Sequence, residues 1–124
     1  MPSNENALRV FVVDDDPLVL AVTRRVLMRA GYEAAIFDDP RPALVAIERD
    51  PPFAVVADLN MPDLSGSELL AEVKQRAPHS LRVLYTGEDT ALELEPGLVH
   101  AVLAKAGVMQ SLPDTLARLR IEVR

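Results

Sequence analysis

Four aspartates of this 124-residue chain lie directly after short apolar stretches. Asp14, Asp15 and Asp16 follow the apolar run 10–13, and Asp58 follows the run 53–57. Carboxylates about 4 Å apart repel each other by roughly 4 kcal/mol at an effective dielectric constant of about 20. If these aspartates converge, their cluster therefore requires a raised pKa, a basic neighbour or a bound metal ion.

A hydroxyl and an amine also lie at the ends of expected strands, further along the chain. Thr86 follows the expected strand 81–85, and Lys105 comes at the end of the expected strand 100–104. Mg²⁺ prefers oxygen ligands, and an aspartate can act as a nucleophile toward a phosphoryl group. A lysine neutralises charge on transferring phosphoryl oxygens, and a threonine can hydrogen-bond the product phosphate. Together these residue types indicate phosphoryl chemistry.

The elements that must position these residues alternate between strands and helices. Short β-branched apolar runs predict strands, apolar residues at helical spacing predict helices, and Asp16 before Pro17 predicts a helix cap. The expected strands are 8–13, 33–37, 53–57, 81–85 and 100–104. The expected helices are 17–30, 40–49, 67–77, a short one within 88–98, and 110–120. This alternation predicts a parallel sheet covered by helices, with the polar strand ends at one edge.

The order and spacing of these residues resemble the receiver domain of two-component response regulators. The resemblance covers residues 8–120 and rests on four motifs: Val12-Val13-Asp14-Asp15-Asp16, Asp58-Leu59-Asn60-Met61-Pro62-Asp63-Leu64-Ser65-Gly66, Leu84-Tyr85-Thr86-Gly87, and Lys105. It implies an α/β, flavodoxin-like doubly wound (βα)5 fold, a three-layer sandwich whose parallel strands lie in the order 2-1-3-4-5. We expect residues 1–7 to be a disordered N-terminal tail and residues 8–124 to be a single receiver domain.

The resemblance also implies a phosphorylation site and a metal site. Asp58 would be the phosphoacceptor, with the phosphoryl group supplied by a histidine kinase or a phosphotransfer protein. Asp15 would bind Mg²⁺ directly and Asp14 would bind it through a water. Asp58 and the backbone carbonyl of Asn60 would complete the protein ligands.

Further roles follow from the same resemblance. Lys105 would pair with Asp58 and then with its phosphate, and Thr86 would be the switch hydroxyl that moves toward the phosphoryl group. Asn60 and Glu88 match the variable positions that tune phosphate hydrolysis in the family. An amide and an acid there resemble the members that lose phosphate quickly. The expected consequence of phosphorylation is a change in a protein-interaction surface.

The sequence departs from the family pattern around Lys105. Receiver domains usually place a proline after this lysine, at a cis bond, whereas Ala106 follows here. Because a non-proline cis bond costs about 3–4 kcal/mol, the placement of Lys105 stays open. Val102 also stands where the family commonly has an aromatic residue. These departures motivate one alternative, a pseudo-receiver that keeps the fold as an interaction module without switching.

A phosphatase is the more remote alternative. Asp14-x-Asp16 after an apolar strand resembles the nucleophile motif of haloacid-dehalogenase-type phosphatases. Those enzymes need a later acidic pair for Mg²⁺, and the only acids after Lys105 are Asp114 and Glu122. The receiver interpretation, in contrast, predicts that the protein is not an enzyme. It would be a phosphoacceptor that assists its own phosphorylation and dephosphorylation.

The composition of the chain excludes several classes of partner and chemistry. A net charge of −6 argues against direct binding of nucleic acid. No run reaches the ~18 apolar residues of a membrane helix, and the start has no signal-peptide pattern, so we expect a cytoplasmic protein. The absence of cysteine excludes disulfides and thiolate catalysis. The output partner, the oligomeric state, and whether the chain stands alone or belongs to a larger protein stay open.

Overall fold

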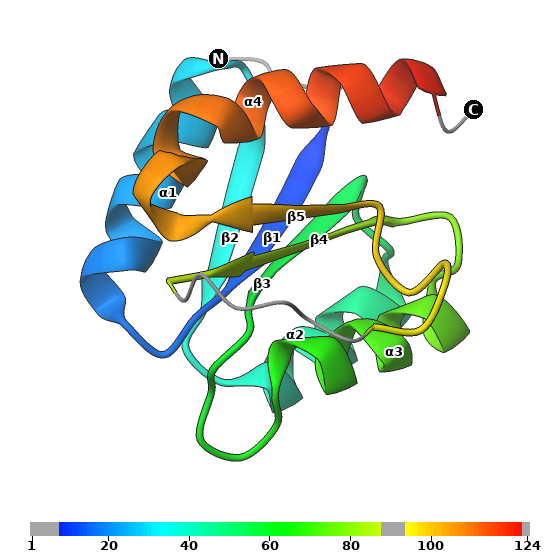
Figure 1. The fold of residues 1–124 in the computed structure, drawn as a ribbon. Coiled ribbons are helices and arrows are strands. Elements are labelled where there is room, and N and C mark those ends of the chain that lie inside the picture. Colours follow the sequence, from blue (N-terminus) through cyan, green and yellow to red (C-terminus); the bar gives the residue numbers. More distant parts are fainter. Residues whose placement is uncertain (1–7, 88–93, 123–124) are drawn as a thin grey trace.

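Five parallel strands form one sheet in the order β2-β1-β3-β4-β5 (Figure 1). The computed structural model describes residues 8–87 and 94–122, without the side chains of residues 105–110. The strands are β1 (Arg9–Val13), β2 (Glu33–Phe37), β3 (Ala54–Asp58), β4 (Leu81–Thr86) and β5 (Ala101–Ala104). All four neighbouring pairs are parallel, which confirms the predicted sheet order.

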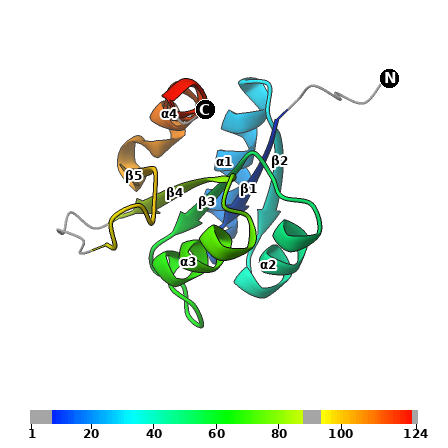
Figure 2. The ribbon, with the colours of Figure 1, turned by 90° about the vertical axis from the view of Figure 1, so that its right-hand side faces the viewer.

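Four helices of the described residues cover the two faces of this sheet. They are α1 (Pro17–Arg29), α2 (Pro40–Arg49), α3 (Gly66–Arg76) and α4 (Lys105–Glu122). Figure 2 shows α1 and α4 on one side of the sheet and α2 and α3 on the other. The predicted three-layer α/β sandwich is therefore confirmed.

Each of the first three helices is preceded by a residue whose side chain caps its N-terminus. Asp16 accepts a hydrogen bond from the backbone N–H of Leu18 at 2.9 Å, so it caps α1 as predicted. Asp39 caps α2 in the same way, and Ser65 forms a capping box with Glu68 at the start of α3. Such caps stabilise a helix by about 1 kcal/mol each and fix where it starts.

Alternation along the strands separates the core into two clusters. Val10 and Val12 of β1 face α1 and α4, whereas Phe11 and Val13 face α2 and α3. Every residue of β3 and β4 is buried, as expected for central strands covered on both faces. Asp58 thus ends a fully buried strand, and Asp14 directly follows β1, in which residues 10–13 are buried.

A buried arginine fixes the chain between β4 and β5. Arg82 is 5% exposed, and its guanidinium donates to the carbonyl oxygens of Leu98 at 2.7 Å and Gly97 at 3.1 Å. The same group also donates to the carbonyls of Pro78 and Ser80. Burial lowers the pKa of Arg82, and the carbonyl dipoles offset part of that desolvation.

We expect Arg82→Met to lower the free energy of unfolding by about 2–3 kcal/mol, because it leaves buried carbonyls without their charged donor. Urea unfolding of the variant measures this loss. Arg25→Met is the matched control, since Arg25 is exposed on α1. Its effect should stay within about 0.5 kcal/mol. Equal effects of the two substitutions would show that the Arg82 contacts add no stability.

Two predicted helices differ from the structure. The short helix expected within 88–98 lies partly outside the described residues, and its described part, 94–98, is a turn at Pro96-Gly97. Gly97 has a φ of 80°, a backbone conformation that ends regular helix. The sequence predicts the last helix at 110–120, whereas the structure begins it at Lys105, so Lys105 is not part of a strand. A glycine inside a helix costs only about 1 kcal/mol, so Gly107 does not prevent the helix from starting at Lys105.

The start of α4 also bears on the peptide bond between Lys105 and Ala106, whose geometry the sequence leaves open. Lys105 and Ala106 both lie in the first turn of α4. Across residues 8–87 and 94–122, every peptide bond is trans. None of the helices in these ranges is long and apolar enough to cross a membrane.

Candidate functional site

Three aspartates meet at the carboxyl edge of the sheet. Asp58 is the last residue of β3, and Asp14 directly follows β1, in which Val13 lies beside Ala57. One carboxylate oxygen from each of Asp14, Asp15 and Asp58 lies within 4.8 Å of the others. Asp14 is 0% and Asp58 2% exposed, whereas Asp15 is exposed. The cluster thus has two buried carboxylates and one that faces solvent.

Hydrogen bonds orient the two buried carboxylates. Oδ1 of Asp14 accepts from the backbone N–H of Asp16 at 2.9 Å, and Oδ2 accepts from the Tyr85 hydroxyl at 2.6 Å. Oδ1 of Asp58 accepts from the backbone N–H of Asn60 at 3.4 Å. Burial, and then the hydrogen bond to Asp14, raise the pKa of Tyr85, so this phenol stays protonated and remains a donor.

Thr86 lies at the same edge as the aspartates. Tyr85 pairs with Asp58 in the parallel register, which places Thr86 one residue beyond Asp58 on the neighbouring strand. Thr86 is 5% exposed. It pairs in turn with Ala104, the residue before Lys105, so the backbone of Lys105 reaches this edge as well. The Lys105 side chain and all of Glu88 lie outside the described part of the chain.

The loop after Asp58 returns to it at Gly66. The backbone N–H of Gly66 donates to the carbonyl oxygen of Leu59 at 2.9 Å. A Cβ atom at Gly66 would lie 2.2 Å from the carbonyl oxygen of Asp58 and 2.8 Å from Cδ1 of Leu84. Met61 is 9% exposed and packs into the core beside α2 and α3. The spacing from Asp58 to Gly66 is therefore set by a close backbone approach and an apolar anchor.

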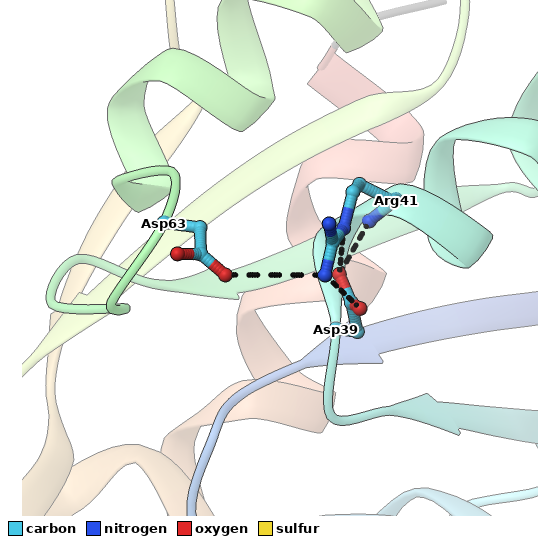
Figure 3. A network of polar contacts seen from close by, with 3 residues as sticks. All are labelled: Asp39, Arg41 and Asp63. Carbon is cyan, nitrogen blue, oxygen red and sulfur yellow. Dashed lines mark hydrogen bonds and ion pairs between the residues drawn. The ribbon is translucent and has the colours of Figure 1, made fainter.

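An exposed ion pair connects this loop to the start of α2 (Figure 3). Arg41 donates from Nη2 to Asp39 Oδ2 at 2.8 Å, and the same nitrogen lies 3.9 Å from Oδ2 of Asp63. The hydrogen bond from the Arg41 side chain lowers the pKa of Asp39. Because Arg41 and Asp63 are both largely exposed, their long contact contributes little to stability.

The carboxylate cluster has the chemistry of a site for a small divalent cation. Mg²⁺ binds through one or two carboxylates and keeps several waters, and Asp15 opens the cluster to solvent. Two carboxylates buried side by side also repel each other, and a bound cation offsets this repulsion. Asp14, Asp15 and Asp58 therefore fit a Mg²⁺ ion.

Comparison with known proteins decides the family. The family model of the response regulator receiver domain matches residues 10–114. The chain belongs to this family. Response regulator MprA of Mycolicibacterium vanbaalenii is 34% identical over 117 residues, which cover 94% of this chain and 51% of MprA. This receiver domain thus spans about half the length of that curated relative.

Solved structures agree with the fold of this receiver domain. The signal receiver domain of an HD domain-containing protein from Pseudomonas fluorescens matches with a TM-score of 0.84 and 23% identity, covering 94% of this chain and 96% of that one. The response regulator TrrA from Thermotoga maritima, solved in complex with Mg²⁺ and BeF, matches with a TM-score of 0.82 and 23% identity. This match covers 90% of this chain and 98% of TrrA. At these identities the likeness establishes the architecture.

The structure unites the predicted aspartates and adds one residue that sequence reasoning missed. Asp14, Asp15 and Asp58 converge, and Thr86 ends the adjacent strand. The roles assigned to these residues, and to Lys105, Asn60 and Glu88, stay predictions. The missed residue is Tyr85, whose hydroxyl donates to Asp14. The signal for it in the sequence is a phenol within a strand expected to be buried, because a buried tyrosine hydroxyl requires a partner.

Proposed function

We propose that this receiver domain accepts a phosphoryl group on the Asp58 carboxylate with the help of Mg²⁺. The convergence of Asp58 with Asp14 and Asp15 within 4.8 Å is the observation that supports it most. The donor would be the phosphohistidine of a histidine kinase or phosphotransfer protein in the cytoplasm. The family membership of the chain supports this choice over the haloacid-dehalogenase-type phosphatase.

The transfer uses an oxygen of Asp58 as the nucleophile. This oxygen attacks phosphorus, the bond from phosphorus to the donor nitrogen breaks, and its electron pair stays on nitrogen. An acyl phosphate then remains on Asp58. Asp58 is 2% exposed, and burial strengthens the electrostatic interactions that act on the reacting group.

The neighbouring residues handle the charge that the phosphoryl group adds. Asp14, Asp15, Asp58 and the backbone carbonyl of Asn60 would hold Mg²⁺, which when bound neutralises charge on the phosphoryl oxygens. Lys105 would pair with the phosphate from the start of α4. The Thr86 hydroxyl would donate to a phosphoryl oxygen, and Asn60 and Glu88 would tune how fast water removes the phosphate.

Phosphorylation would alter the surface beside Thr86. The group adds about −1.5 to −2 charges, which must bias a two-state element to produce a signal. We assign this role to the segment 86–98, which connects β4 to β5 along the chain. Unchanged amide chemical shifts of Gly87, Gly97 and Leu98 after addition of beryllofluoride and Mg²⁺ would contradict this part of the proposal.

Asp15→Asn tests the metal site, because Asp15 is exposed and its replacement leaves the core intact. We expect the Mg²⁺ concentration for half-maximal labelling by acetyl phosphate to rise about tenfold, which corresponds to roughly 1.4 kcal/mol of lost cation binding. Labelling is followed by intact-protein mass spectrometry across a Mg²⁺ series.

Asp16→Asn is the matched control for this experiment. It removes the same charge from the adjacent position, and asparagine caps a helix about as well as aspartate. Its Mg²⁺ dependence should equal that of the wild type. An equal Mg²⁺ requirement in both variants would exclude Asp15 as a ligand, and no labelling of the wild type at all would favour the pseudo-receiver.

A further inference from the structure

Tyr85 joins the hydrophobic core to the acidic cluster. It is one of the largest fully buried side chains, at 0% exposed, and it packs in the core cluster that contains Val83, Leu112 and Leu116. Its hydroxyl reaches Asp14, a residue 71 positions earlier in the chain, at 2.6 Å. A ring fixed by packing from β4 and α4 therefore presents its one polar atom to the predicted metal site.

The hydrogen bonds of Asp14 restrict how its carboxylate can turn. Tyr85 donates to Oδ2 at 2.6 Å, a distance typical of an O–H donor to a carboxylate, and the backbone N–H of Asp16 donates to Oδ1 at 2.9 Å. These donors come from two different parts of the sheet edge. Together the two donors bond both oxygens of Asp14 and hold the plane of its carboxylate.

We propose that Tyr85 is a positioning residue for Mg²⁺, which orients the Asp14 carboxylate before the ion arrives. The inference rests on the metal site of the proposed function. Mg²⁺ demands nearly ideal octahedral geometry, so a ligand held in place by its own hydrogen bonds binds it better than a freely rotating one. Outer partners of metal ligands typically change metal affinity by about 10–100-fold when they are removed.

Tyr85→Phe tests this role because it keeps the ring in the core and removes only the hydroxyl. The dissociation constant of Mg²⁺ is measured by titration, using the amide shifts of Asp16 and Asn60 as reporters. We expect it to rise about tenfold in this variant. Tyr32→Phe is the matched control, because Tyr32 is the other tyrosine of the chain and stacks on Phe53, with ring centroids 6.1 Å apart.

The outcomes separate this inference from the proposed function. Equal Mg²⁺ dissociation constants for the wild type and Tyr85→Phe would overturn the positioning role and leave the phosphoacceptor proposal standing. A wild type that does not bind Mg²⁺ would overturn the metal site, and the inference with it. A rise confined to Tyr85→Phe supports the inference.

A second measurement does not depend on the stability of Tyr85→Phe. The chain has no tryptophan and two tyrosines, so in Tyr32→Phe the tyrosine absorption comes from Tyr85 alone. Mg²⁺ should change the near-ultraviolet spectrum of this variant, since binding at Asp14 alters the hydrogen bond of the phenol. A spectrum unchanged at saturating Mg²⁺ would contradict the coupling of Tyr85 to the metal site.

Discussion

We expect Asp58→Asn to abolish Mg²⁺-dependent labelling of the chain by acetyl phosphate. An amide oxygen is a poor nucleophile, so an acyl phosphate cannot form at this position, and labelling should fall by about 100-fold or more. The substitution preserves the shape of a side chain that is 2% exposed. It also removes one of three neighbouring carboxylates. The fold should therefore be retained, because the repulsion within the cluster decreases.

Asp63→Asn is the matched control for this loss. Asp63 lies in the same loop as Asn60, its side chain is 73% exposed, and its charge changes by the same amount. It should be labelled as fast as the wild type in parallel time courses analysed by intact mass. If the Asp58→Asn variant is labelled at the wild-type rate, Asp58 is not the phosphoacceptor.

Gly66→Ala is expected to lower the free energy of unfolding by about 3 kcal/mol, at the upper end for an overpacked site. The new Cβ would lie 2.2 Å from the carbonyl oxygen of Asp58, so the backbone that holds the acceptor would have to move. The higher helix propensity of alanine offsets only about 1 kcal/mol. Urea unfolding measures the stability, and the labelling rate by acetyl phosphate should fall as well.

Gly31→Ala separates this steric effect from the loss of a glycine in general. Gly31 follows α1 with a φ of 94°, and a Cβ there would meet no atom within 4 Å. Its substitution should cost about 1–2 kcal/mol through backbone strain and leave the labelling rate unchanged. If Gly66→Ala is as stable as the wild type, or labels as fast, the close approach of α3 to Asp58 has no functional importance.

The arrangement of strands was predictable because the local patterns agree with one another. Short β-branched runs, Asp16 and Asp39 as helix caps, and glycine after α1 all indicate the same alternation of strands and helices. Parallel strands bring their carboxyl ends to one edge, so Asp14 and Asp58 had to meet if the topology was right. This part of the site follows from sequence position alone.

Other features depend on contacts that local patterns do not encode. The hydrogen bond from Tyr85 to Asp14 forms only when β4 pairs with β3 in the observed register. It also depends on the core cluster in which the Tyr85 ring packs with residues of α4. Arg82 is buried although arginine is almost always exposed, because four carbonyl groups of the surrounding turns converge on it. The start of α4 at Lys105 was not predictable from local pattern either, because the helix includes Gly107, a residue of low helix propensity.

Locating the phosphoryl group within the chain is the most direct test of the proposed function. The protein is labelled with acetyl phosphate and Mg²⁺, the acyl phosphate is reduced with borohydride, and tryptic peptides are sequenced by mass spectrometry. Trypsin separates residues 10–24, which contain Asp14, Asp15 and Asp16, from residues 50–74, which contain Asp58. We predict reduction at Asp58 in the second peptide. Reduction at Asp14 in the first peptide, or no Mg²⁺-dependent label in either, would contradict the assignment of Asp58 as the phosphoacceptor.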